Sequence, residues 1–162
     1  MVTTDHESKR RTMVEEQLAR RNIHSEAVLT ALRTVPRHLF VPTHLMDQAY
    51  EDRALGLGPG QTISQPYIVA LMTQLADVLG KERVLEVGTG SGYQAAVLAE
   101  LCGEVFTIER DQTLASGARK NFKRLHYNNI HMHHGDGRLG WPEHAPFDAI
   151  LVTAVAREVP KA

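Results

Sequence analysis

Three glycines stand at alternate positions where a predicted strand turns into a helix. They are Gly88, Gly90 and Gly92, within the sequence Val-Leu-Glu-Val-Gly-Thr-Gly-Ser-Gly-Tyr of residues 84–93. Glycine permits a positive φ and lets a ligand approach the backbone closely. In a dinucleotide-binding fingerprint the third glycine comes one residue later, at the position that Tyr93 holds. The spacing therefore favours a nucleoside ligand without a pyrophosphate over a nicotinamide cofactor.

Two acidic side chains are expected beside the same ligand. Glu109 stands at the predicted end of the next strand, roughly 20 residues after Gly88, where a carboxylate can accept hydrogen bonds from both ribose hydroxyls. Asp136 lies between two glycines after the third strand and could accept a hydrogen bond from an adenine amino group, although Gly-Asp-Gly is also a good turn. Ligands of such sheets sit outside the carboxyl ends of the strands, so these residues are expected to converge on an adenosyl group.

The elements that must position these residues alternate along the chain. Strands are predicted at residues 83–87, 105–109, 130–134 and 147–153, and helical composition fills 94–101 and 114–125. This alternation predicts an α/β fold with a parallel sheet flanked by helices. The expected strand order is third, second, first, fourth.

The first 80 residues are predicted to be mainly helical. Apolar spacing indicates two short N-terminal helices, with Ser25 as the N-cap of the second. The glycine-rich segment 51–61 is interpreted as a loop. Pro66 suits the first turn of a helix whose apolar residues recur up to Gly80. We therefore expect a single domain, with an N-terminal helical and substrate-side segment at 1–65 and a cofactor-binding core at 66–162.

The composition is that of an ordinary globular protein. The chain has 162 residues, 43% of them hydrophobic and 23% charged, which suits one domain. With 18 basic and 19 acidic side chains it has no broad basic field for nucleic acid or an anionic membrane. Cys102 is the single cysteine and is expected to be a buried, inert thiol. The absence of an apolar signal or membrane-spanning run favours a cytoplasmic location.

Two side-chain clusters have a functional and a structural interpretation. His131 and His133 would share one face of a strand, with His134 beside them, an arrangement that can bind metal. No further ligands follow at recognisable spacing, so no metal is expected. The basic residues between 119 and 124 lie at helical spacing and indicate a solvated helix face rather than an RNA site.

Beyond the glycine turn, the chain closely resembles protein-L-isoaspartate O-methyltransferases over most of its length. The resemblance rests on the glycine turn of residues 84–93 and on these stretches: Gly60-Gln61-Thr62-Ile63-Ser64-Gln65-Pro66-Tyr67, Val35-Pro36-Arg37, Phe40-Val41, Gly135-Asp136-Gly137, Phe147-Asp148-Ala149-Ile150, Val152-Thr153-Ala154 and Val159-Pro160. A generic methyltransferase would share only the glycine turn.

This resemblance implies a Rossmann-like, S-adenosylmethionine-dependent methyltransferase. The implied reaction moves a methyl group to the free carboxylate of L-isoaspartyl residues in damaged proteins and peptides and leaves S-adenosyl-L-homocysteine. The ester then collapses to a succinimide, which reopens partly to normal aspartate, so the implied role is protein repair. The implied cofactor-binding residues are Gln61, Thr62, Ile63, Glu86, Gly88, Thr89, Gly90, Glu109, Arg110, Asp136 and Gly137.

Ser64 matches the active-site serine of that family. A carboxylate with a pKa near ~4 is already ionised at neutral pH and needs no strong general base. Ser64 is therefore interpreted as a residue that orients the carboxylate by one hydrogen bond, and not as a nucleophile. The structural interpretation is a serine at the start of the helix near Pro66.

The family continues beyond the position of Val159-Pro160, whereas this chain ends at Ala162. We therefore expect the strand at 147–153 to be an exposed apolar sheet edge, across which the chain could form a homodimer. Two alternatives to the repair enzyme stay open. One is a truncated, non-catalytic domain that binds S-adenosylmethionine, and the other is a nicotinamide-dependent oxidoreductase.

Overall fold

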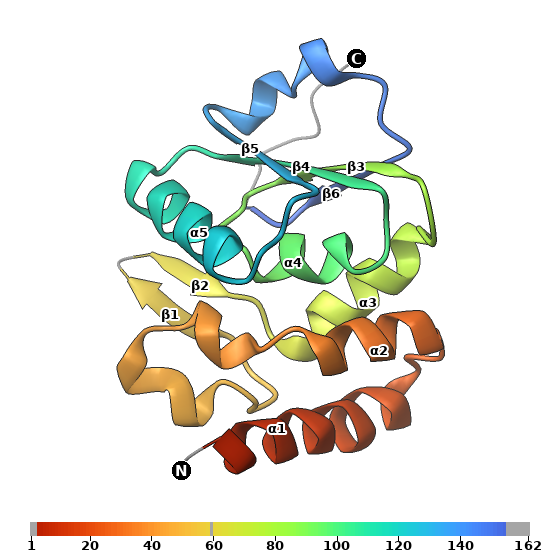
Figure 1. Cartoon of the computed structure of the whole chain (residues 1–162), viewed down its shortest axis with the longest axis vertical. Helices are drawn as coiled ribbons and strands as arrows, with labels where there is room; N and C mark the ends of the chain where they lie inside the picture. The colour runs from red at the N-terminus through yellow and green to blue at the C-terminus, as the bar shows by residue number, and fades with distance from the viewer. Residues whose placement is uncertain (1–2, 59, 155–162) are drawn as a thin grey trace.

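The computed structural model describes residues 3–58 and 60–154. A four-stranded sheet lies across the molecule, with three helices beneath it and the N-terminal helices beneath those (Figure 1). Its strands are β3 (Arg83–Val87), β4 (Glu104–Glu109), β5 (Ile130–His134) and β6 (Ala149–Val152). They pair in parallel in the order β5-β4-β3-β6. The predicted α/β class and the predicted strand order are confirmed.

The two faces of this sheet have different coverings. One face is covered by α3 (Pro66–Ala76), α4 (Tyr93–Ala99) and α5 (Gln112–Arg124). Successive residues of a strand point to opposite faces. Val105 and Leu151 therefore pack with the helices, whereas Phe106 packs against Trp141 and Phe147 on the other face. Both faces of the central strands are buried, as expected for a parallel sheet.

The N-terminal layer contains the two predicted helices, α1 (Thr3–Thr12) and α2 (Glu26–Thr34). A π-helical turn at Met13–Leu18 continues α1, and the Ser25 hydroxyl caps α2 by accepting a hydrogen bond from the Val28 amide at 3.4 Å. One cluster of buried side chains joins this layer to α3 and α4. No helix in the described part of the chain is long and apolar enough to cross a membrane.

The predicted loop at residues 51–61 is wrong in part. This segment contains β1 (Leu55–Gly58), which pairs antiparallel with β2 (Gln61–Ile63). Leu55 and Ile63 are register partners and both are buried, so packing against the core stabilises a hairpin that glycine-rich composition hides. Gly60 provides the turn with a φ of 70°. The hairpin leads the chain directly into the Ser64 segment.

The ends of several elements also differ from the prediction, most clearly those of α3 and β6. Helix α3 ends at Ala76, because Asp77 adopts a left-handed φ of 50°, so residues up to Gly80 lie outside it. Strand β6 is shorter than the predicted 147–153. Phe147 packs on Phe106, and the Thr153 hydroxyl donates a hydrogen bond to the Gly88 carbonyl at 2.6 Å. The flanks of β6 thus hold neighbouring segments in place.

Candidate active site

A small cavity of about 40 Å³ lies at the carboxyl ends of the central strands. In this cavity residues 62–64, at the end of the hairpin, lie against the glycine turn. These two segments are distant in sequence. Of the residues that the sequence predicts in the site, those lining the cavity are Thr62, Ile63, Ser64, Glu86, Gly88, Thr89 and Gly90. Gln61, Glu109, Arg110, Asp136 and Gly137 are not among its lining residues.

The glycine turn is crowded at both ends and open at its middle glycine. Gly88 has a φ of 104°, and a Cβ there would lie 2.8 Å from the Ala154 Cβ. Gly92 has a φ of 90°, and its Cβ would lie 2.6 Å from a ring carbon of Phe122. At Gly90 a Cβ would meet no atom within 4 Å. The turn therefore requires glycine for its shape and is open to a ligand at Gly90.

Glu109 fixes the shape of this turn. Its Oε2 accepts a hydrogen bond from the Gly90 amide at 2.9 Å, and its Oε1 accepts one from the Asp111 amide at 2.9 Å. A carboxylate offers about four acceptor positions, so both oxygens retain the capacity to accept hydroxyl groups. The structure thus places Glu109 beside the open position of the turn, as expected for a ribose-binding residue.

Asp136 and Gly137 follow β5, and Gly137 lies against Val87 at the end of β3. A Cβ at Gly137 would lie 2.4 Å from Val87 Cγ1, so only glycine fits there without a shift. Asp136 Oδ1 accepts a hydrogen bond from the Arg138 amide at 3.0 Å, and the carboxylate also pairs with the Arg138 guanidinium. These hydrogen bonds lower the pKa of Asp136 to about 2. Asp136 is therefore an ionised acceptor at neutral pH.

Glu86 is fully buried in the cavity wall. Its Oε2 accepts a hydrogen bond from the Thr107 hydroxyl, which lies 2.6 Å from the Thr89 hydroxyl. Its Oε1 has no hydrogen-bond partner among the described residues. Burial raises the pKa of Glu86 to about 8, and the charge of Glu109 acts in the same direction. The cavity therefore contains a largely neutral carboxyl group with one oxygen available to a ligand, which fits a donor such as an ammonium group.

Ser64 is not the cap of the following helix. The N-cap of α3 is Gln65, with Pro66 at its first turn, and no side chain caps it. The structural interpretation of Ser64 as a helix-start residue is therefore wrong. Its carbonyl accepts a hydrogen bond from Arg37 Nη2 at 2.8 Å, which fixes the backbone of a residue that lines the cavity.

Arg37 was predicted only as part of a matching stretch, and its role comes from the structure. Its side chain is fully buried and also donates from Nε to the Ala49 carbonyl at 2.7 Å. The guanidinium lies 4.8 Å from the centre of the Tyr93 ring. Burial lowers the pKa of Arg37 and raises that of Tyr93 to about 12. A lone arginine within the apolar stretch around Phe40 was the signal available in the sequence.

The histidines of β5 and Cys102 lie outside this cavity. His131 stacks on Phe106 at 4.8 Å, and His133 lies 5.1 Å from Trp141. Within residues 3–58 and 60–154, no three His, Cys, Asp or Glu side chains form a metal-binding group. The prediction for Cys102 is confirmed, because it is buried, its thiol donates to the Leu98 carbonyl at 3.2 Å, and burial raises its pKa to about 11.

Comparison with known proteins gives consistent matches. The family model described as protein-L-isoaspartate(D-aspartate) O-methyltransferase (PCMT) matches residues 8–162. A protein-L-isoaspartate O-methyltransferase of Opitutus terrae is 60% identical over 153 residues, which are 94% of this chain and 66% of that protein. One of Syntrophobacter fumaroxidans is 58% identical over 92% of this chain and 70% of its own length. The chain thus spans about two thirds of the length of these relatives.

Solved structures agree with these matches. A protein-L-isoaspartate O-methyltransferase superposes with a TM-score of 0.84 at 30% identity, over 95% of this chain and 50% of that chain. A Plasmodium falciparum beta-aspartate methyltransferase, solved in complex with S-adenosyl-L-homocysteine, gives a TM-score of 0.78 at 28% identity, over 93% of this chain and 76% of its own. The described fold is therefore that of the methyl-transfer family.

We predict that Glu86→Gln removes a pH dependence of stability in the ligand-free chain. The folded pKa of about 8 lies above the ordinary 4.5, so the folded state retains a proton that the unfolded state releases in this window. The free energy of unfolding should therefore fall as pH rises from about 5 to about 8, by a few kcal/mol through Glu86, and less in the variant.

Urea unfolding of the wild type and the variant across this range measures that difference. Glu143→Gln, at an exposed position, is the matched control and should keep the wild-type slope. Equal slopes in the wild type and in Glu86→Gln would contradict the prediction.

We also predict that Arg37→Lys lowers the free energy of unfolding by about 2 kcal/mol. Lysine has a single ammonium group, which cannot donate to both the Ala49 and Ser64 carbonyls and also lie over the Tyr93 ring. Arg33→Lys is the control, because Arg33 pairs with the exposed Glu26 and should change stability by less than about 0.5 kcal/mol. Denaturant unfolding measures the stability of both variants. Similar losses in the free energy of unfolding would refute a special role for Arg37.

Proposed function

The chain belongs to the protein-L-isoaspartate(D-aspartate) O-methyltransferase family, and from this premise we propose that it transfers a methyl group from S-adenosylmethionine to the free carboxylate of L-isoaspartyl residues. Damaged proteins and peptides are its partners, and repair is its role. One observation carries the proposal: the cavity that sets Ser64 against Glu86 and the glycine turn. The S-adenosyl-L-homocysteine bound to the Plasmodium falciparum neighbour supports the cofactor.

The described residues fit this cofactor. Glu86 Oε1 is a buried acceptor without a partner, suited to the ammonium group, and the backbone of residues 88–90 is open to the methionine portion at Gly90. Glu109 is assigned to the ribose hydroxyls, and Asp136 with Gly137 to the adenine. Thr62 and Ile63, which line the cavity, and Gln61 and Arg110, which do not, are assigned to the remaining cofactor contacts. When bound, the cofactor supplies a methyl group on a positively charged sulfur.

The residues of the chain orient the reacting groups. The substrate carboxylate is ionised at neutral pH, so no general base is required. The Ser64 hydroxyl donates a hydrogen bond to one carboxylate oxygen, and Arg37 holds the Ser64 backbone. Ile63, Val69 and Tyr93 form apolar walls that exclude water. An ammonium group beside Glu86 displaces the proton that burial retains there.

The two parts of the proposed single domain have separate tasks. Residues 1–65 form the substrate side and contribute the Ser64 segment, and residues 66–162 form the cofactor-binding core. The lone Cys102 suits the reducing environment of the cytoplasm, which we propose as the location.

We predict that this chain methylates an isoaspartyl peptide and not the same peptide with normal aspartate. Ser64→Ala should lower the rate constant by about 10- to 100-fold, since it removes one orienting hydrogen bond, and should leave cofactor binding unchanged. Labelled S-adenosylmethionine measures transfer and calorimetry measures binding.

Ser8→Ala, at an exposed position of α1, is the control and should keep full activity. Cofactor binding without transfer to either peptide would favour the alternative of a non-catalytic S-adenosylmethionine-binding domain. An absence of cofactor binding would refute the proposal.

We further propose that a second copy of the chain pairs with the free edge of β6. Among the described strands, β6 has a neighbour on one side only, β3. Ile150 is 61% exposed and Val152 is 47% exposed, and their spacing places them on one face. An exposed apolar edge strand is a template for pairing with another chain.

The wild type is expected to sediment as a dimer at micromolar concentration, and Ile150→Lys as a monomer because the charge would be buried at the interface. Leu139→Lys is the matched control, since Leu139 is 75% exposed but belongs to the turn at Gly137–Leu139 and not to β6, and it should stay dimeric. A wild type that is monomeric at all concentrations would contradict the proposal.

A further inference from the structure

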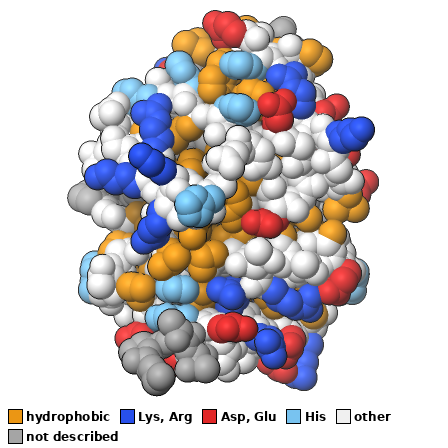
Figure 2. Space-filling model, viewed as in Figure 1, with side chains coloured by type: hydrophobic (Ala, Val, Ile, Leu, Met, Phe, Trp, Pro, Cys, Tyr) orange, Lys and Arg blue, Asp and Glu red, His pale blue; other side chains and the backbone are white. Residues whose placement is uncertain are grey.

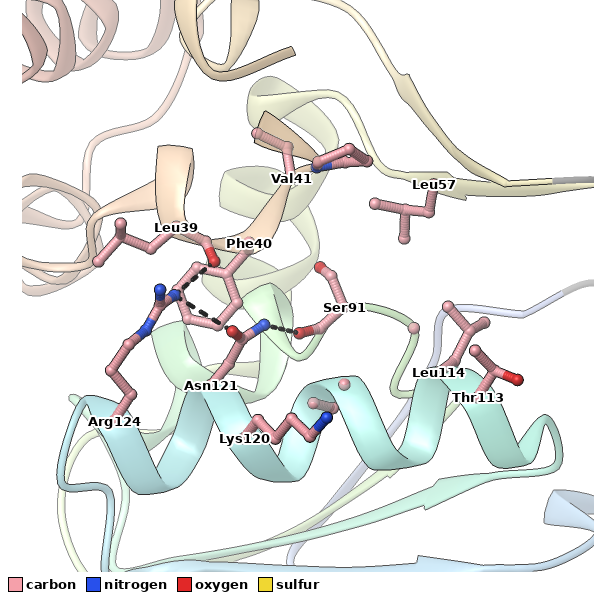
Figure 3. Close-up of a pocket in the computed structure, with 14 residues that line it drawn as sticks. Leu39, Phe40, Val41, Leu57, Ser91, Thr113, Leu114, Lys120, Asn121 and Arg124 are labelled. Atoms are coloured by element: carbon pink, nitrogen blue, oxygen red, sulfur yellow. Dashed lines mark hydrogen bonds between the residues drawn. The ribbon is translucent and has the colours of Figure 1, made fainter. Parts of the chain in front are cut away.

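A second and larger cavity lies between α5 and the N-terminal layer (Figure 3). Its volume is about 420 Å³. The walls come from residues 39–42, from Leu57 of β1, and from the face of α5 that carries Leu114 and Gly117. Most of this lining is apolar, so the cavity suits an apolar side chain.

This larger cavity adjoins the candidate active site. Gly90 and Ser91 line both cavities. Leu57 belongs to β1, whose partner strand β2 contains Thr62 of the smaller cavity. A molecule in the larger cavity therefore contacts the same glycine turn and the same hairpin that form the reaction site.

Hydrogen bonds hold the walls of the larger cavity together. Asn121 Nδ2 donates to the Ser91 carbonyl at 3.1 Å, and Arg124 Nη2 donates to the Leu39 carbonyl at 2.8 Å (Figure 3). These contacts connect α5 to the glycine turn and to the N-terminal layer. The cavity is thus preformed, which favours binding because less ordering is required.

The rim of the cavity is basic. Lys120 and Arg124 line it, and no acidic side chain does. The basic residues between 119 and 124 are exposed, which confirms the predicted solvated helix face, and Figure 2 shows Lys and Arg side chains gathered over α5. Glu109 and Asp136, the residues assigned to ribose and adenine, do not line the cavity. Its occupant is therefore expected to be apolar with an adjacent anion.

We propose that this cavity binds the segment of the polypeptide substrate next to the isoaspartyl residue, with one apolar side chain inside and an acidic residue beside Lys120. The inference rests on the proposed function, because that function makes the substrate a polypeptide. The cavity beside Ser64 is the smaller of the two, so the flanking residues of a polypeptide are expected to lie outside it. The larger cavity is the adjoining surface with matching chemistry.

Gly117→Leu tests this assignment without strain. Gly117 lies within α5, and a Cβ there would meet no atom within 4 Å. Leucine also has a higher helix propensity than glycine, so the variant should fold and fill part of the cavity. Gly117→Ala is the matched control, because it changes the same position and leaves most of the space open.

The readout is calorimetric binding of isoaspartyl peptides of equal length to the full chain with S-adenosyl-L-homocysteine. The wild type should bind a leucine-flanked peptide about tenfold more tightly than a glycine-flanked one, or about 1.4 kcal/mol. Gly117→Leu should lose this preference and Gly117→Ala should keep it. Lys120→Glu should lose a preference for aspartate over lysine at a neighbouring position.

Equal affinity of the wild type for the leucine- and glycine-flanked peptides would overturn the inference, and so would an unchanged preference in Gly117→Leu. The same peptides with normal aspartate separate the two proposals. If the normal-aspartate peptides bind as tightly as the isoaspartyl peptides and show the same preference for leucine, the isoaspartyl function fails while the cavity assignment is supported.

Discussion

The Arg37 guanidinium lies buried where three parts of the chain meet. It donates to the carbonyls of Ala49 and Ser64 and lies over the Tyr93 ring, so it joins the N-terminal layer, the active-site segment and the first residue of α4. A buried charge is costly unless its donors are satisfied by well-placed acceptors. Nε and Nη2 of Arg37 have backbone carbonyls as acceptors, whereas Nη1 has no partner among the described residues. The position of Ser64 therefore depends on the packing around this buried charge.

Two carboxyl groups at the ends of neighbouring strands have different electrostatic roles. Glu109 accepts two backbone hydrogen bonds and holds the glycine turn in shape. Glu86 is enclosed, so burial raises its pKa to about 8 and one oxygen lacks a partner. The difference in their hydrogen bonding arises from the surrounding structure and not from residue type. A cationic ligand would complete the environment of Glu86, which makes the site complementary to a positively charged cofactor.

The proposed chemistry requires orientation more than acid or base catalysis. The acceptor carboxylate is ionised without help, and the site supplies a hydroxyl at Ser64, a rigid turn and apolar walls. The two cavities share Gly90 and Ser91, and the one beside Ser64 is the smaller. The arrangement suits an enzyme that encloses one altered residue and leaves a wider surface for the surrounding polypeptide.

The sequence by itself determined the parallel sheet and the glycine turn. These features follow from local causes: apolar runs form buried strands, and the positive φ at Gly88 requires glycine. The strand order was predicted from the resemblance to methyltransferases. Local pattern did not indicate the hairpin of β1 and β2, the raised pKa of Glu86 or the contacts of Arg37. Only the tertiary structure decided them, because burial and hydrogen bonding between residues far apart in sequence depend on how the layers pack.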